Sequence, residues 1–302
     1  MKALVSGGAG FIGSNLALEL EKKCYETVVV DSLFSGTKSN LKGFKGEFMK
    51  QDVSEKSVKS DLNEKFDIIF HHAAITDPRY EGDDDLYAKN VQGFKNMVEL
   101  AQKNNAKLIY ASSASVYGNG HVPMEEDQEK DPFSDYARSK LKMDEIASRY
   151  FGKMHIVGLR YFNVFGPRES HKGRPASMIY HLRKQMLQGK NPRLFKYGEQ
   201  KRDHIYVMDV VTANLLALKS RPGVYNIGTG IGTTFNDLVK TLNEVLKTKL
   251  EIEYFDNPYR SDYQENTQAD MAKSEKMLGF KAQYSLKKGI AEYNQFLRKN
   301  GE

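Results

Sequence analysis

Hydrophobic residues in the first half of the chain gather in short runs, separated by stretches in which they recur at helical spacing. The runs have few polar interruptions and cover residues 2–6, 27–30, 66–70, 107–111 and 156–160. Such runs are typical of strands that are buried on both faces of a parallel sheet. Helical spacing is found between them, over residues 11–22, 86–104 and 135–147. Strand and helix in alternation predict an α/β fold with a doubly wound parallel sheet, of the Rossmann type.

The chain has 302 residues, enough for a large sheet domain and a smaller second domain. We expect residues 1–166 to form the sheet domain and residues 167–302 to form a smaller α/β domain. Residues 225–228 again have the composition of a strand, so the chain is expected to return to the sheet domain at about residues 203–228.

Composition and charge exclude several classes of protein. No apolar run reaches about 18 residues, the length of a membrane-spanning helix. The net charge of +6 is spread along the chain without a basic helix, so we expect no nucleic-acid partner. The single Cys24 excludes an internal disulfide, and the first strand begins at Lys2 without a signal peptide. We therefore expect a cytoplasmic protein with no membrane partner.

His71 and His72 are adjacent at the end of a predicted strand, yet they indicate no metal site. Successive side chains of a strand point to opposite faces, so the two imidazoles cannot chelate one ion together. We predict no metal ligand. The small Ala73 and Ala74 that follow leave room for a ligand at the carboxyl end of the strand.

A glycine motif lies between the first strand and the first helix. Gly7, Gly10 and Gly13 form the pattern G-x-x-G-x-x-G, and Asp31 closes the second strand. Glycines let the backbone approach a pyrophosphate, and the helix N-terminus offers free N–H groups to it. Strand, glycine turn, helix, strand and acid together indicate a dinucleotide-binding βαβ unit.

The residues after the second strand bear on which dinucleotide binds. Asp31 can accept a hydrogen bond from the adenosine ribose 2′-hydroxyl, which favours NAD. Ser32 and Lys38 follow, and a lysine there can meet a 2′-phosphate and permit NADP. NAD and NADP therefore both stay open. The other cofactor contacts that we predict are Phe11, Ile12, Asp52, Val53, His72, Ala73, Ala74, Thr76, Asn90 and Val164.

Tyr136 and Lys140 are candidates for acid–base chemistry. They are i and i+4 in a predicted helix, so their side chains leave the same face. A nearby cation favours the phenolate and lowers the pKa of a tyrosine, which makes a general base near neutral pH. Upstream, the hydroxyls of Ser112, Ser113 and Ser115 can hydrogen-bond a substrate alcohol or cap the strand before them.

Glycine motif, serine cluster and Tyr-x-x-x-Lys together resemble the extended short-chain dehydrogenase/reductase superfamily, over essentially the whole chain. The resemblance implies that Tyr136 is the catalytic acid/base. It implies that Lys140 lowers the pKa of Tyr136, holds the nicotinamide ribose and so also binds the cofactor together with Tyr136. Ser113, rather than Ser112 or Ser115, is expected to hydrogen-bond the reacting oxygen. A tightly bound, recycled cofactor and a homo-oligomer are further implications.

Segments of the second half narrow this resemblance. Residues 161–169 read YFNVFGPRE, residues 170–173 read SHKG, and residues 262–270 contain Tyr-Gln followed by Thr-Gln-Ala-Asp. Together they are similar to the ADP-L-glycero-D-manno-heptose 6-epimerases. The similarity implies an isomerase that oxidises C6 of a nucleotide sugar and returns the same hydride to the other face. The substrate contacts that it implies are Ser113, Asn163, Arg174, His181, Phe195, Lys196, Tyr197, Gly198, Arg202 and Tyr263.

Lys172 has a separate place in this resemblance. Inversion of a carbon needs proton chemistry from two directions, and the family similarity puts a second acid/base at Lys172, which is also expected to contact the cofactor. A lysine can do this if burial or nearby positive charge lowers its pKa. A lysine that contacts phosphate or solvent is the alternative.

The chain departs from the family pattern at three places. Ser6 replaces a threonine, Ser170 replaces a glycine, and Arg174-Pro175 replaces a pair of small residues beside the sugar. Three other functions therefore stay open: a UDP-hexose 4-epimerase, an NAD(P)-dependent oxidoreductase that releases reduced cofactor, and a cofactor sensor without turnover. The intact Tyr136 and Lys140 pair counts against the sensor.

Overall fold

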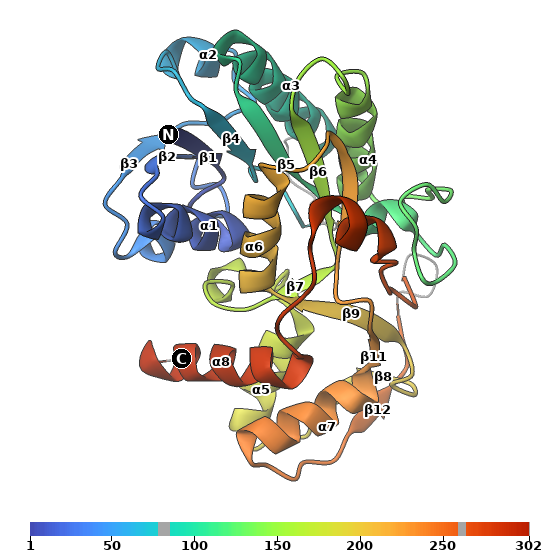
Figure 1. The fold of residues 1–302 in the computed structure, drawn as a ribbon. Helices are drawn as coiled ribbons and strands as arrows, with labels where there is room; N and C mark the ends of the chain where they lie inside the picture. The colour runs from blue at the N-terminus through green and yellow to red at the C-terminus, as the bar shows by residue number, and fades with distance from the viewer. Residues whose placement is uncertain (78–84, 259–263, 302) are drawn as a thin grey trace.

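The computed structural model describes residues 1–77, 85–258 and 264–301. Seven parallel strands form its central sheet: β1 (Lys2–Ser6), β2 (Glu26–Asp31), β3 (Glu47–Lys50), β4 (Ile68–His71), β5 (Lys107–Ser113), β6 (Ile156–Tyr161) and β10 (Gly223–Ile227). Their order is β10-β6-β5-β4-β1-β2-β3 (Figure 1). The direction of winding reverses between β1 and β4, so the predicted doubly wound α/β fold is confirmed.

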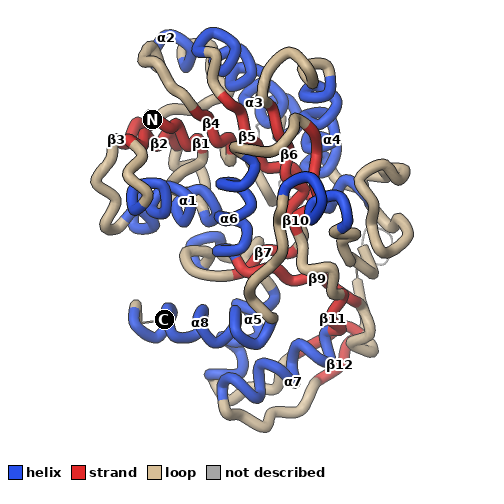
Figure 2. Tube along the Cα trace, in the orientation of Figure 1, coloured by secondary structure: helices blue, strands red, loops and turns tan. Residues whose placement is uncertain are grey.

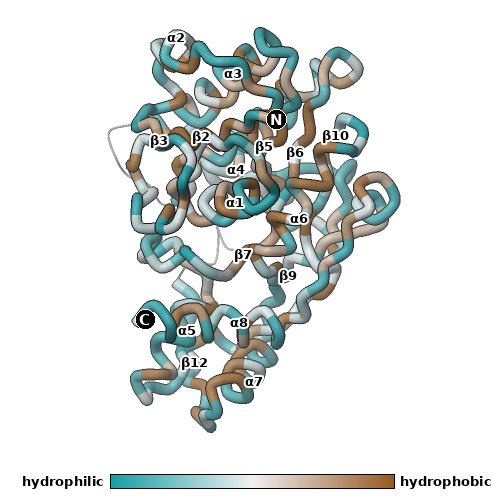
Figure 3. The backbone as a smooth tube through the Cα atoms, turned by 60° about the vertical axis from the view of Figure 1, so that its left-hand side comes forward, coloured by the Kyte–Doolittle hydropathy of each residue, from teal (hydrophilic) through white to brown (hydrophobic). Residues whose placement is uncertain are grey.

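Helices cover both faces of this sheet. One face carries α1 (Phe11–Lys22) and α6 (Val207–Ala217), and the other carries α2 (Val58–Asp61), α3 (Leu86–Asn104) and α4 (Asp135–Ser148). Figure 2 shows the strands enclosed between the two sets of helices. In Figure 3 the strands β6 and β10 are drawn mainly brown, as expected of strands buried on both faces. Within the described residues, no helix is long and apolar enough to cross a membrane.

A smaller lobe lies beside the sheet. It contains a three-stranded sheet in the order β11-β9-β7 and a strand pair, β8 with β12. Its strands are β7 (Asn163–Phe165), β8 (Arg193–Phe195), β9 (Lys201–Tyr206), β11 (Gly232–Thr234) and β12 (Glu253–Phe255), and its helices are α5 (Met178–Leu187), α7 (Phe235–Leu246) and α8 (Leu286–Lys299). These helices surround a core of their own (Figure 1). The chain rejoins the large sheet through α6 and β10, while the domain border at residue 166 stays a prediction.

Two strand boundaries differ from the sequence prediction. Strand β5 continues to Ser113, because Ser112 and Ser113 pair with residues of β6. Strand β4 begins at Ile68, and the backbone N–H of Phe66, two residues earlier, donates to Asn104 Oδ1 of α3 at 3.0 Å. The serine cluster therefore begins inside the sheet, not in a loop after it.

Side-chain caps start two helices that reach the site. Helix α4 begins after Ser134, whose hydroxyl accepts the Ala137 N–H at 3.2 Å. Helix α3 begins after Asp85, whose carboxylate accepts the Ala88 N–H at 2.8 Å. The acidic sequence over residues 81–85 is typical of a helix start, and of these only Asp85 is among the described residues.

Candidate active site

The glycine loop lies between the carboxyl ends of β1 and β4. Gly7 has a φ of +69°, and a Cβ on it would stand 2.5 Å from the backbone nitrogen of Ala73. A Cβ on Gly13 would stand 2.3 Å from the carbonyl oxygen of Gly7. Glycine is therefore required at both positions, at one for the turn and at the other for the close packing of α1 on the loop. The N-terminus of α1 is left open for an anion.

A cavity follows this edge of the sheet, where carboxyl ends of parallel strands meet. It brings together the predicted residues Gly7, Gly10, Phe11, Ile12, Gly13, Asp31, Ser32, Asp52, Val53, His72, Ala73, Ala74, Thr76, Asn90, Ser113, Tyr136, Lys140, Val164 and Lys172. Every predicted catalytic residue lines it. Their roles remain predictions, but the fold places residues from distant parts of the sequence around one space.

Asp31 closes β2 at the cavity, as the motif predicts. Its carboxylate accepts the N–H groups of Ala9, at 2.9 Å, and Leu33, at 2.8 Å. Burial raises the pKa of Asp31, and these backbone N–H groups oppose the rise. Lys38 is placed differently from the prediction, because its Nζ lies 4.7 Å from the centroid of the Phe48 ring and Lys38 is not one of the residues that line the cavity.

Tyr136 and Lys140 project from one face of α4. Lys140 is 2% exposed, and its Nζ donates to the carbonyl oxygen of Ala111 at 2.8 Å and lies 5.7 Å from the centroid of the Tyr136 ring. Burial lowers the pKa of Lys140 to about 8. Burial also raises the pKa of Tyr136, against the hydrogen bond from Ser113. The structure thus differs from the expected lowering, because desolvation of the phenol outweighs its neighbours.

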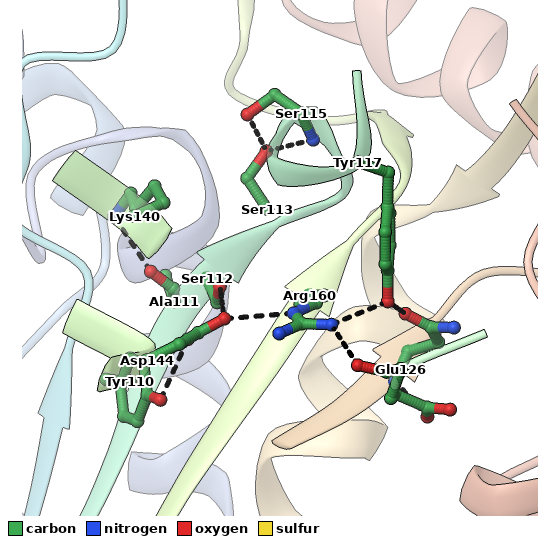
Figure 4. A network of polar contacts seen from close by, with 11 residues as sticks. Tyr110, Ala111, Ser112, Ser113, Ser115, Tyr117, Glu126, Lys140, Asp144 and Arg160 are labelled. Carbon is green, nitrogen blue, oxygen red and sulfur yellow. Dashed lines mark hydrogen bonds and ion pairs between the residues drawn. The ribbon is translucent and has the colours of Figure 1, made fainter. Parts of the chain in front are cut away.

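The three serines after β5 differ in what their hydroxyls contact. Ser112 donates to Asp144 Oδ2 at 3.0 Å, so its hydroxyl is directed into a buried network (Figure 4). Ser115 donates to Ser113 Oγ at 2.9 Å. Ser113 contacts the Tyr136 hydroxyl and lines the cavity. Of the three, Ser113 is therefore the one placed beside the tyrosine.

Lys172 reaches the cavity from the short helical turn Ser170–Lys172, and its Nζ lies 5.7 Å from the centroid of the Phe11 ring. The loop around it is held by Glu169, which is fully buried and accepts the N–H groups of Gly166, at 3.1 Å, and Ser177, at 2.7 Å. Burial lowers the pKa of Lys172, and the charges of Glu169 and Asp77 oppose this. Lys172 and Tyr136 therefore reach one space from different elements.

Asn90 lines the cavity, but its amide holds other parts of the protein. Its Oδ1 accepts the Ile75 N–H at 2.8 Å, and its Nδ2 donates to the Ile75 carbonyl and to Ser139 Oγ, both at 3.1 Å. Because Ser139 belongs to α4, this amide connects α3 to the helix that carries Tyr136. Sequence reasoning predicted a cofactor contact and missed this bridging position.

The predicted substrate contacts of the second half that the structure describes lie in the smaller lobe or near it, outside the set of residues that line the cavity. Asn163 Nδ2 donates to the Asp203 carbonyl at 3.2 Å and to Thr267 Oγ1 at 2.9 Å. One Arg202 nitrogen donates to the carbonyls of Lys201 and Glu265, both at 2.9 Å. The lobe therefore holds these two residues through segments near the end of the chain.

The other residues of this group lie on the surface of the same lobe or near it. His181 Nε2 lies 3.2 Å from the Arg174 carbonyl. The rings of Phe195 and Tyr197 contact those of other aromatic residues in edge arrangements, and Lys196 forms an ion pair with Asp256 at 3.1 Å. Gly198 has a φ of +75°. Tyr263 lies outside the described residues.

Sequence reasoning missed several residues that line the cavity: Val30, Phe34, Ser35, Gly36, Gln51, Ser54, Ile75, Lys89, Gly93, Ala111, Tyr161, Phe162 and His171. Most stand next to a predicted residue along the chain, so a wider window around each motif would have found them. Gly93 is found only through helical spacing, because it lies one turn after Lys89. Among the described residues, no three His, Cys, Asp or Glu side chains gather as around a metal ion.

Comparison with known proteins gives consistent matches over the chain. The model of the family "NAD dependent epimerase/dehydratase family" matches residues 3–228. ADP-L-glycero-D-manno-heptose-6-epimerase of Brachyspira hyodysenteriae is 36% identical, over 99% of this chain and 98% of its own. The crystal structure of the Helicobacter pylori protein of that name has a TM-score of 0.93 at 37% identity, covering 98% of this chain and 96% of its own. UDP-glucose 4-epimerase of Thermotoga maritima, with UDP-glucose, has a TM-score of 0.92 at 31% identity, covering 100% of both chains.

Proposed function

The chain belongs to the NAD-dependent epimerase/dehydratase family and is a nucleotide-sugar epimerase, an isomerase, and on this premise we propose that it inverts C6 of ADP-D-glycero-D-manno-heptose. The product, ADP-L-glycero-D-manno-heptose, is an isomer of the substrate, so no cofactor is consumed. Full-length similarity to two ADP-heptose epimerases, at 36% and 37% identity, supports the substrate. The observation that carries the proposal is the presence of Lys172 in the same cavity as Tyr136.

The residues around the glycine loop fit a nicotinamide dinucleotide. Gly7 and Gly13 keep side chains out of the turn where a pyrophosphate would lie against the N-terminus of α1. We assign NAD rather than NADP, because a buried carboxylate at Asp31 would repel a 2′-phosphate, while Lys38 lies on the Phe48 ring. When bound, the nicotinamide ring supplies a reversible acceptor for one hydride.

Tyr136 takes the proton of the C6 hydroxyl while that carbon is oxidised. Ser113 contacts the Tyr136 hydroxyl, so it can hold the same substrate oxygen. Tyr136 must be ionised before it can accept that proton, and the nearby Lys140 ammonium, anchored on the Ala111 carbonyl, favours this phenolate against the burial that raises the Tyr136 pKa. This positioned acid/base is worth about 10²–10⁴-fold in rate.

Lys172 completes the inversion. After the ketone has turned its other face to the cofactor, Lys172 delivers a proton to the oxygen from a second direction. Burial lowers its pKa, which brings the lysine closer to the range where it can both give and accept a proton. Arg202 suits the diphosphate of the substrate, because its planar guanidinium can bind two oxygens.

A UDP-hexose 4-epimerase is the second candidate. The observation in its favour is the TM-score of 0.92 to the Thermotoga maritima UDP-glucose 4-epimerase, over the whole of both chains. Homo-oligomeric assembly stays a prediction.

The test is an incubation of the purified protein with ADP-D-glycero-D-manno-heptose in one arm and UDP-glucose in the other. Sugar stereochemistry is followed by NMR, and nicotinamide absorbance is recorded together with it. Inversion at C6 without accumulation of reduced cofactor is the expected result. Inversion of UDP-glucose alone would overturn the substrate assignment, and steady accumulation of reduced cofactor would show a net oxidoreductase.

A further inference from the structure

Asp144 is a buried carboxylate to which the proposed reaction gives no role. It is 5% exposed and lies on α4, one helical turn after Lys140. Its Oδ1 accepts the Tyr110 hydroxyl at 2.9 Å, and its Oδ2 accepts the Ser112 hydroxyl at 3.0 Å and Arg160 Nε at 2.9 Å (Figure 4). A buried carboxylate must be paired and hydrogen-bonded, and these three donors satisfy Asp144.

The three donors come from one face of the large sheet. Tyr110 and Ser112 are two residues apart in β5, and Ser112 pairs with Arg160 of β6. Asp144 therefore fixes α4 to two adjacent strands at once. The register leaves α4 little freedom to slide or rotate on the sheet.

The same end of β5 also holds the two candidate catalytic residues of α4. The Ala111 carbonyl accepts Lys140 Nζ at 2.8 Å, and Ser113 contacts the Tyr136 hydroxyl. Ser112, between these two residues, contacts Asp144. The consecutive residues 111–113 therefore contact three residues of α4, one each. A shift of α4 would thus change the Lys140 and Tyr136 contacts together.

We propose that Asp144 is a positioning residue of the reaction, which docks the helix of Tyr136 and Lys140 on the sheet and stabilises the Lys140 ammonium by its negative charge. The inference rests on the proposed function, in which that ammonium favours the Tyr136 phenolate. Asp144 is not one of the residues that line the cavity, so it acts through Tyr136 and Lys140, which do line it.

The charges around Lys140 support this assignment. From its own helix it faces Tyr136 and Asp144, and from the end of β4 it faces His71 and His72. Burial holds the pKa of His71 well below its ordinary value and that of His72 at about 3, so both are neutral. Burial lowers the pKa of Lys140 to about 8, and Asp144 is the charge that opposes this.

Arg160 of β6 is the cationic partner of Asp144. It is 4% exposed, and its second nitrogen donates to the Tyr117 hydroxyl at 2.8 Å and to the Glu126 carbonyl at 2.9 Å. Arg160 would remain charged if the Asp144 charge were removed, so Asp144→Asn would leave two buried cations on this side of α4. The loss of the Asp144 charge and the uncompensated charge of Arg160 both make the Lys140 ammonium less favourable.

The test is a direct titration of Lys140 in protein labelled with ¹³C at lysine Cε, with the Lys140 signal assigned by its loss in Lys140→Met. In Asp144→Asn we expect the Lys140 midpoint to fall by about one pH unit, the low end of the range for a nearby opposite charge. The alkaline limit of epimerase activity should fall with it. Tyr110→Phe removes a hydrogen bond from the same carboxylate without changing its charge, so it should lower the melting temperature but leave the midpoint in place.

An unchanged Lys140 midpoint in folded Asp144→Asn, or an equal fall in Tyr110→Phe, would overturn the proposal. If Asp144→Asn does not fold, Asp144→Asn/Arg160→Gln removes both charges of the ion pair and carries the same test. Asp144→Glu should restore the midpoint, because the charge returns. A wild-type protein that fails to invert ADP-heptose would contradict the proposed function and leave this titration interpretable.

Discussion

The cofactor side and the substrate side of the site differ in how their residues are held. Around the large sheet, Asp31 is fixed by Ala9 and Leu33, which belong to the same βαβ unit. In the smaller lobe, Asn163 and Arg202 are fixed by Thr267 and Glu265, near the end of the chain. One side is therefore organised by local motifs, and the other by contacts across the whole chain.

Substitutions on the two sides should therefore have different effects. Residues of the cavity are proposed to act on the reacting atoms or on the cofactor, so their loss should reduce the catalytic rate. Residues of the smaller lobe are proposed to hold the remote parts of the substrate, so their loss should weaken binding. The following predictions test that separation, from the largest expected effect to the smallest.

Tyr136→Phe should reduce kcat by about 10²–10⁴-fold, because it removes the positioned acid/base. The phenyl ring keeps the packing of α4, so the melting temperature should change little. A Tyr136→Phe variant that retains the wild-type rate would show that Tyr136 is not the acid/base. The cofactor side would then differ from the substrate side less than proposed.

Lys172→Met should reduce kcat by about 10²-fold in both reaction directions, since each direction needs the second acid/base. Lys190→Met is the matched control, because Lys190 is an exposed lysine of the smaller lobe. Steady-state rates with both heptose epimers provide the measurement. Equal rates in Lys172→Met and wild type would show that Lys172 is not a second acid/base.

Lys140→Met should stabilise the protein at pH 7 while it reduces activity. The pKa of Lys140 is about 8 in the folded protein, below its ordinary value of 10.5, so the unfolded chain binds the proton more tightly. The cost is fully present below pH 8 and disappears as the pH rises from 8 to 10.5. After loss of the bond to Ala111, a net gain of about 2 kcal/mol remains at pH 7.

Urea unfolding at pH 7 and pH 10 measures this gain. The difference between Lys140→Met and wild type should be largest at pH 7 and should shrink or reverse at pH 10. A difference that is the same at both pH values would show that burial does not lower the pKa of Lys140.

Arg202→Met should raise KM for the nucleotide sugar about tenfold, the loss of one charge-assisted contact of about 1.4 kcal/mol. NAD affinity should stay unchanged, because Arg202 is not one of the residues that line the cavity. Arg221→Met, at an exposed arginine, is the control. A loss of NAD affinity in Arg202→Met would show that Arg202 also acts on the cofactor, which contradicts the proposed separation of the two sides.

Much of the fold and the cofactor side could be predicted from local patterns. The G-x-x-G-x-x-G spacing and the Tyr-x-x-x-Lys spacing each lie within one strand–loop–helix unit, so their geometry follows from neighbours in sequence. Lys38 lies away from the predicted place and the bridging contact of Asn90 was missed, because Phe48 and Ser139, which they contact, come from other segments. The pKa of Tyr136 was misjudged because burial is a property of the packed protein, not of the helix.

The sequence by itself determined the alternation of strands and helices, the glycine turn and the shared helix face of Tyr136 and Lys140, since periodicity and backbone sterics act over a few residues. The tertiary structure decided which serine faces Tyr136, how Lys172 reaches the cavity, and that Asp144 lies against β5 and β6. These depend on contacts between residues tens of positions apart, and their energies come from burial and from charges that meet only when the chain is folded.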